Sequence, residues 1–207
     1  MRLRPTATLA LAAVTAVAFL LILLSGASDI ASLQLGFIPL RMSVEAQGAW
    51  LPAWLTPLTA TLVHAGWLHL IMNMILLAWC GREVERILGP AGVVVLYVVG
   101  AFAAAAAQYA LNPLAAYPMV GASGAISALV GAFALSFGRP KPIVRNFRLN
   151  RAINTLWILV AWVVLQWMTG YLMGMQGVAV ATGAHVGGFI AGVILQKPLL
   201  LWRYRKA

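Results

Sequence analysis

A serine set among very small residues is the first candidate for chemistry in this chain. Ser123 lies in the run 121–125, Gly-Ala-Ser-Gly-Ala, where a polar loop with prolines gives way to an apolar helix. Neighbours of this size leave the hydroxyl open to another helix, so Ser123 could act as a nucleophile. Small residues also let membrane helices approach closely, so a packing role for the run is the alternative interpretation.

A histidine near the end of the chain lies in a similar setting. His185 belongs to the run 183–188, Gly-Ala-His-Val-Gly-Gly, and further small residues share its predicted helix face. Ser123 begins a comparable strip of small residues on its own helix. Two such strips can pack closely enough for side chains to form hydrogen bonds across them.

A second polar pair lies earlier in the chain. His69 and Asn73 are four residues apart, so a helix would place both on one face. Strongly polar groups at membrane depth are costly and usually face a cavity or each other. The pair is therefore a predicted site.

Composition identifies the elements that must position these residues. Of 207 residues, 63% are hydrophobic and 9% are charged, which indicates a membrane protein. We predict an all-α, polytopic bundle of six transmembrane helices, forming a single domain over 1–207. The expected spans are 6–24, 66–81, 91–111, 123–138, 152–170 and 178–196. All ten prolines fall outside their interiors, as expected because proline breaks the helical hydrogen-bond ladder.

Positive charge predicts the orientation of the spans. Thirteen of the fourteen Lys and Arg residues fall on one side, and only Arg41 falls on the other. Such residues are retained in the cytoplasm, so we expect both termini there and keep the first span as an anchor. The net charge of +10 does not indicate nucleic-acid binding, because the basic residues flank the spans and no soluble domain carries them. We interpret it as topology signals and contacts with anionic lipid heads of the bilayer. We also expect the charges between 81 and 89 to be solvated and locally paired.

Depth connects the three polar stretches. With this orientation the second, fourth and sixth spans run in the same direction, and Asn73 and His185 lie roughly 10 Å deep at 1.5 Å per residue. His69 and Ser123 lie nearer the outer end of the same layer. If the small residues served only for helix packing, there would be no reason for polar residues from three separate stretches to lie in one layer.

The types of residue in this layer predict acyl transfer. Serine needs a base to take its proton, and His185 is the candidate. The four acidic residues all lie outside the spans, so we predict a Ser-His dyad instead of a triad. Asn73, His69 and the backbone N–H of Ser123 are the candidate donors to the oxyanion.

These residues resemble the rhomboid family of intramembrane serine proteases. The matching features are Gly-Ala-Ser-Gly at 121–124, His69 with Asn73, His185 amid glycines, and the pattern of Gly81, Glu85 and Gly89. The resemblance covers essentially the whole six-helix core.

The resemblance implies cleavage of transmembrane protein substrates near the outer membrane boundary. It implies Ser123 as nucleophile, His185 as general base, and His69 and Asn73 as oxyanion helpers, with no metal and no organic cofactor. A mobile cap would lie at 171–177, and the Trp-bearing first loop, 25–65, would be a lateral membrane element. We expect a bacterial inner membrane as the location; no oligomeric state follows from the resemblance.

Two positions depart from the family's pattern. Leu55 and Thr56 stand where many bacterial members have a Trp-Arg pair in the first loop. Ser127 stands where many have an aromatic residue that stacks on the catalytic histidine. The anchoring of the first loop and the orientation of His185 must therefore come from other residues.

Three alternatives remain beside the protease. The first is an inactive rhomboid-like protein that binds membrane clients, although loss of the serine or histidine would mark that class and both are present. A channel or transporter could use His69, Asn73 and His185, but proton relays usually recruit acids within the spans. A metal site would need His64 as well, which lies close to the interface.

Overall fold

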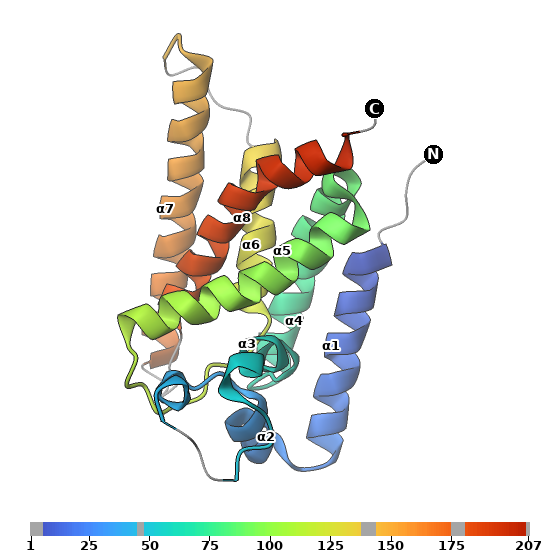
Figure 1. The fold of residues 1–207 in the computed structure, drawn as a ribbon, viewed down its shortest axis with the longest axis vertical. Coiled ribbons are helices and arrows are strands. Elements are labelled where there is room, and N and C mark those ends of the chain that lie inside the picture. The colour runs from blue at the N-terminus through green and yellow to red at the C-terminus, as the bar shows by residue number, and fades with distance from the viewer. Residues whose placement is uncertain (1–5, 45–47, 138–143, 175–180, 206–207) are drawn as a thin grey trace.

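The protein is built almost entirely of helices (Figure 1). The computed structural model describes residues 6–44, 48–137, 144–174 and 181–205. The elements are α1 (Thr6–Leu24), α2 (Ser28–Leu35), η1 (Pro39–Met42), η2 (Ala53–Leu55), α3 (Thr56–Thr59), η3 (Ala60–Leu62), α4 (Trp67–Leu76), the π-helical turn η4 (Leu77–Gly81), α5 (Arg82–Leu111), α6 (Ser123–Phe137), α7 (Phe147–Gly174) and α8 (Thr182–Arg203). Within these ranges the β pairing is limited to one isolated bridge, which confirms the all-α prediction.

The long helices have the length and composition of membrane spans. Within the described part of the chain, four stretches qualify, at 6–24, 67–111, 147–168 and 182–203, and α6 is a shorter apolar helix. Large side chains such as Leu9, Trp79 and Val164 are exposed, an arrangement that is stable against lipid and unfavourable against water. The protein is therefore a multi-pass membrane protein.

The stretch 67–111 contains a reversal of the chain. Gly89, inside α5, has φ of 76° and ψ of 171°, outside the helical region, and Pro90 follows it. The arms on either side of Gly89 run in opposite directions (Figure 1). They correspond to the predicted second and third spans, joined by a tight turn.

Small residues let α5, α6 and α8 pack with their backbones almost touching. A side chain at Gly188 or Gly192 of α8 would collide with backbone carbonyl oxygens of α6, and one at Gly124 of α6 would collide with Ala104 of α5. Because lipid gives no hydrophobic force between helices, such close van der Waals packing is what holds them together. The predicted strips of small residues do meet.

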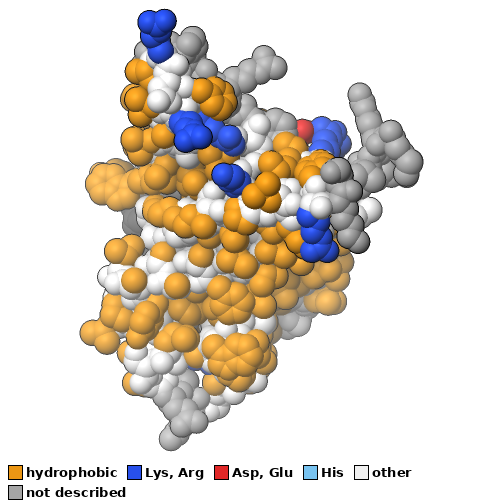
Figure 2. All heavy atoms as spheres, turned by 45° about the horizontal axis from the view of Figure 1, so that its top comes forward, with side chains coloured by type: hydrophobic (Ala, Val, Ile, Leu, Met, Phe, Trp, Pro, Cys, Tyr) orange, Lys and Arg blue, Asp and Glu red, His pale blue; other side chains and the backbone are white. Residues whose placement is uncertain are grey.

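Lys and Arg side chains gather, on the face that Figure 2 shows, at the end of the bundle where α1 begins and α8 ends, which we call the basic end. Glu83 and Arg86 form an exposed ion pair there, as predicted. The prediction was wrong for Glu85, which is 4% exposed. Its carboxylate accepts hydrogen bonds from the backbone N–H groups of Thr6, Ala7 and Thr8 at 2.7, 3.0 and 2.9 Å. Spacing could not reveal this partner, because α1 is distant in sequence.

Two glycines flank Glu85 because other chain segments lie against them. A side chain at Gly81 would lie 2.9 Å from the Thr8 methyl group, and one at Gly89 would lie 2.8 Å from the Arg203 guanidinium. Arg203 also donates a hydrogen bond of 3.1 Å to the Glu85 backbone carbonyl. The Gly81, Glu85 and Gly89 pattern thus joins both terminal helices to the α4–α5 hairpin.

Both ends of the predicted sixth span, 178–196, differ from the observed helix. Helix α8 continues through Pro198 to Arg203. The backbone hydrogen bond that Pro198 cannot donate is lost near the basic end, and the Arg203 side chain donates a hydrogen bond to the Glu85 carbonyl. The helix begins at Thr182, because Ala181 has non-helical backbone angles; residues 178–180 lie outside the described part. Hydropathy finds apolar residues and does not find the first or last hydrogen-bonded turn.

The first loop folds into short helices at the opposite end of the bundle, which we call the loop end. Phe37 and Met119 pair through N···O distances of 2.9 and 2.8 Å. Arg41 donates hydrogen bonds to the carbonyls of Leu33 and Leu51 at 3.1 and 3.3 Å. Contacts of this kind anchor the loop, although the Trp-Arg pair common in the family is absent.

Candidate active site

Ser123 is the first residue of α6, at the loop end of the bundle. Gly121, just before it, has φ of +108°, a conformation that favours glycine. Its N–H donates to the Ala60 carbonyl at 2.9 Å, so the first loop fixes the turn that precedes the helix. Backbone N–H groups in the first helical turn have no partner within the helix, and the helix dipole favours negative charge there.

His185 reaches Ser123 from α8. The distance between His185 Nε2 and Ser123 Oγ is 2.7 Å, a hydrogen bond across the α6–α8 contact. The close approach of Gly188, one turn after His185, to Gly124, the residue after Ser123, sets the helix separation that allows this bond. His185 is 6% exposed and Ser123 is half-buried.

The second ring nitrogen of His185 has no carboxylate partner in the part of the chain that the structure describes. His185 Nδ1 is buried without a hydrogen-bond partner among the described residues. Ser127 does not fill this place, because its hydroxyl donates to the Ser123 carbonyl at 2.7 Å. The histidine is therefore oriented by its bond to Ser123 and by packing. The geometry is that of a pair and not of a triad.

His69, on α4, lies against the turn that precedes Ser123. A side chain at Gly121 would lie 2.6 Å from the Cε1 and Nε2 atoms of His69, so this imidazole ring rests on the Gly121 backbone. His69 Nδ1 accepts a hydrogen bond of 3.4 Å from the Ala65 N–H. A neutral ring then holds its hydrogen on Nε2, the atom that faces the turn.

Asn73, one turn further into α4, is buried at 3% exposure. Its Nδ2 donates to the His69 carbonyl at 2.8 Å, which uses one of the two amide hydrogens. Its Oδ1 is buried without a hydrogen-bond partner among the described residues. The amide thus retains hydrogen-bonding capacity within the buried layer.

The structure brings Ser123 and His185 into direct contact and sets His69 against the Gly121 turn. Sequence reasoning missed the role of Gly121, whose positive φ and ring contact require the absence of a side chain. A glycine directly before a predicted helix start was the available signal. It also missed that His64 is buried, with its ring centroid 5.0 Å from that of His69. The predicted cap lies only partly in the described chain, since 175–177 fall outside it.

Residues 52–202 match the model of the rhomboid domain. It is 26% identical over 196 residues to a protein named rhomboid protease GluP from Bacillus subtilis (strain 168), covering 94% of this chain and 36% of that protein. It is 31% identical over 134 residues to rhomboid protease GlpG of Haemophilus influenzae, covering 65% and 64%. RHOMBOID-like protein 5 of Arabidopsis thaliana is 31% identical over 140 residues, covering 67% and 42%.

Fold and site together define a helical membrane protein with a serine-histidine pair between packed helices. The chain belongs to the rhomboid family, whose proteases act on transmembrane substrates within a membrane. The chain spans less than half the length of GluP and of the plant relative.

Proposed function

We propose that this protein is an intramembrane serine endopeptidase that cleaves transmembrane substrates near the outer membrane boundary. The observation that carries the proposal is the 2.7 Å bond between His185 Nε2 and Ser123 Oγ. A serine hydroxyl becomes a useful nucleophile when an adjacent base can take its proton. Membership in the rhomboid family supports the same chemistry.

The dyad would work through an acyl-enzyme. Ser123 Oγ attacks the carbonyl carbon of the scissile peptide while its proton passes to His185 Nε2. Collapse of the tetrahedral intermediate breaks the C–N bond, and His185 gives that proton to the leaving amine. Water then attacks the ester with His185 again as base, which releases the acid product and restores the serine hydroxyl.

The oxyanion would be stabilised from two helices. The Ser123 backbone N–H lies at the start of α6, where orphan donors and the dipole favour negative charge. Asn73 Nδ2 has a second hydrogen to donate, and His69 Nε2 faces the turn before Ser123. Donors aimed at developing charge in a site shielded from water are typically the largest catalytic contribution.

The proposal extends to the setting of the site. The six spans form one domain, both termini lie in the cytoplasm, and the membrane is a bacterial inner membrane. The loop end then faces outward, and exposed Trp50 and Trp54 in the first loop suit the membrane interface. The cap at 171–177 stays a prediction, since 175–177 lie outside the described residues.

Cleavage of a single-span reporter by purified protein in liposomes tests the dyad. Ser123→Ala and His185→Ala should each reduce the rate at least about 10³-fold, and the double variant should be no slower than either one, because the two residues act as a unit. A serine-directed phosphonate should label the wild type and fail to label Ser123→Ala. Ser136→Ala, at the other end of α6, is the matched control and should be labelled normally.

Two outcomes would overturn the proposal. Equal cutting by the wild type and by both single variants would assign the cleavage to a contaminant. A folded wild type that neither cuts nor takes up the probe, while GlpG of Haemophilus influenzae does both in parallel, would favour a client-binding protein without protease activity.

A further inference from the structure

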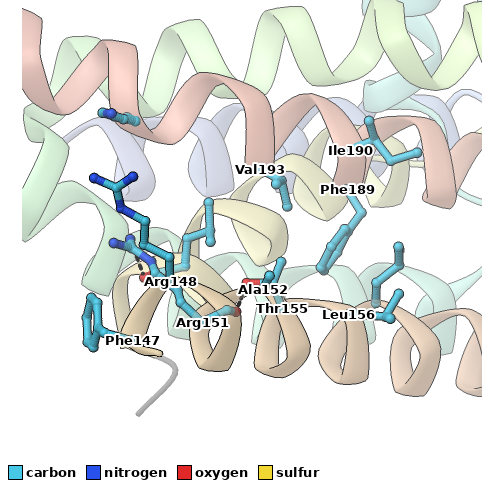
Figure 3. A pocket seen from close by; sticks show the side chains of 12 residues that line it. Phe147, Arg148, Arg151, Ala152, Thr155, Leu156, Phe189, Ile190 and Val193 are labelled. Carbon is cyan, nitrogen blue, oxygen red and sulfur yellow. Dashed lines mark hydrogen bonds between the residues drawn. The ribbon is translucent and has the colours of Figure 1, made fainter. Parts of the chain in front are cut away.

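A cavity remote from Ser123 lies where α7 faces α6 and α8 near the basic end (Figure 3). Its volume is about 720 Å³, within the roughly 300–1,000 Å³ typical of small-molecule sites. The serine-histidine pair does not line it. The proposed proteolysis therefore leaves this cavity without a role.

Three basic side chains line one end of the cavity. Arg148 and Arg151 come from the first two turns of α7, and Lys197 comes from the last part of α8. Arg151 donates a hydrogen bond of 3.1 Å to the Leu135 carbonyl, which uses one of its five N–H groups. All three side chains are exposed, so they remain accessible to an anion.

No acidic side chain neutralises these cations within the described residues. The one ion pair found there joins Glu83 to Arg86, and the Glu85 carboxylate is bonded to the start of α1. Asp29 lies in α2, at the opposite end of the bundle. The cavity thus has a cluster of positive charge that the described protein leaves without a counter-charge.

The rest of the cavity is apolar. Phe189, Ile190 and Val193 of α8 lie across it from Leu156 of α7 (Figure 3), and Leu159 of α7 also lines it. From Arg148 to Leu156, and from Lys197 to Phe189, eight residues of helix correspond to about 12 Å at 1.5 Å per residue. That is most of the roughly 15 Å hydrocarbon depth of one leaflet.

We propose that this cavity binds one anionic phospholipid of the leaflet at the basic end. The lipid phosphate binds Arg148, Arg151 and Lys197, and one acyl chain lies along the apolar wall toward Phe189. Basic pockets between membrane helices on the cytoplasmic side bind anionic lipid headgroups in this way. The site is independent of the proposed chemistry at Ser123.

Charge favours this occupant over an apolar helix. A substrate helix or a second copy of this chain would cover the apolar wall and leave three cations without a counter-charge. An anionic phospholipid matches both parts of the cavity in one molecule. Because Phe189 is one turn from His185 on α8, the bound lipid would also join α7 to the helix that carries the proposed base.

Native mass spectrometry of the purified full chain can test the site by titration with phosphatidylglycerol and with phosphatidylcholine of identical acyl chains. We expect the wild type to prefer phosphatidylglycerol. Each cation near an anionic surface contributes about a fivefold change in affinity. The variants Arg148→Gln and Arg151→Gln should each weaken binding by that factor, while Arg205→Gln, which removes a charge at the same end outside the cavity, should not.

A second pair of variants tests the acyl-chain part of the site. Ala152→Trp fills the cavity and should reduce phosphatidylglycerol binding although every cation remains. Ala161→Trp makes the same change at an exposed position of α7 outside the cavity lining and should bind as the wild type does. Soluble glycerophosphoglycerol, which lacks acyl chains, should fail to compete.

Four results would overturn the proposal. Equal binding of the two lipids would remove the charge argument. Equal losses in Arg205→Gln and Arg148→Gln would indicate a general basic surface instead of a site. Unchanged phosphatidylglycerol binding in Ala152→Trp, with normal thermal unfolding, would show that the headgroup binds without the cavity. A second copy of the chain that stays bound when the lipid concentration is lowered would show that the cavity is a dimer interface.

Discussion

Helices α6 and α7 are consecutive in the chain, yet they are held in opposite ways. Helix α6 is enclosed by α5 and α8, with Ala125, Ile126, Ala128 and Leu129 at 0–1% exposure. Helix α7 is exposed along most of its length, including Trp157 and Trp167 at 65% and 73%. The difference follows from residue size, since glycine and alanine permit close backbone contact and large side chains prevent it.

The two helices therefore differ in how tightly their neighbours fix their positions. The 2.7 Å bond between Ser123 and His185 spans the tightest helix contact, where small residues leave little room for displacement. Helix α7 makes fewer contacts and borders a cavity, so its position depends more on what fills the space around it. We expect the substitution of residues in the two regions to have very different effects.

The largest effect should come from bulk placed in the α6–α8 contact. Gly188→Leu would drive a side chain into the Gly124 carbonyl and should lower the free energy of unfolding by about 3 kcal/mol or more. Ala161→Leu makes a comparable change at an exposed position of α7 and should change it by less than about 0.5 kcal/mol. Thermal unfolding in detergent, followed by tryptophan fluorescence, measures both.

Similar destabilisation by Gly188→Leu and Ala161→Leu would break the comparison, because it would mean that α7 is packed as tightly as α6. The phosphonate probe sharpens the result. It should label Ala161→Leu normally and Gly188→Leu weakly, since the latter separates His185 from Ser123.

An intermediate effect should come from the Glu85 cap of α1. Glu85→Gln weakens charge-assisted hydrogen bonds to Thr6, Ala7 and Thr8 and should cost about 2 kcal/mol of unfolding free energy. Glu83→Gln removes the same charge from an exposed ion pair with Arg86 and should cost less than about 1 kcal/mol. The same thermal unfolding assay applies, and equal melting of the two variants would contradict a special role for Glu85.

The smallest stability effect, with a separate effect on chemistry, should come from Gly121→Ala. Its φ of +108° strains any side chain, as does the φ of +73° at Gly48, so Gly121→Ala and Gly48→Ala should both lose about 1 kcal/mol. Only at Gly121 would the new methyl group meet the His69 ring; Gly48 is open. Reporter cleavage should therefore fall about tenfold or more in Gly121→Ala alone. Equal cleavage by the two variants would show that the position of the His69 ring does not affect the reaction.

The sequence predicted the helical class and the proximity of Ser123 and His185 better than the ends of elements. Apolar runs and charge asymmetry are properties of the chain, so the helices and the layer that contains Ser123 and His185 could be predicted. The Glu85 cap could not, because its partners at 6–8 are distant in sequence and no periodicity connects them. The extension of α8 through Pro198 was likewise hidden, since it depends on where Arg203 finds a partner.

The cap of α1 has a consequence for the order of assembly. Helix α1 precedes Glu85, the acceptor for its opening N–H groups, by 77 to 79 residues. Arg203 of α8 donates a hydrogen bond to the backbone carbonyl of that same residue. Because α4 and α5 are synthesised after α1 and before α8, α1 completes its hydrogen bonds only once the α4–α5 hairpin has formed, and α8 adds its bond later still. Glu85 thus links segments of the chain that are synthesised far apart in time.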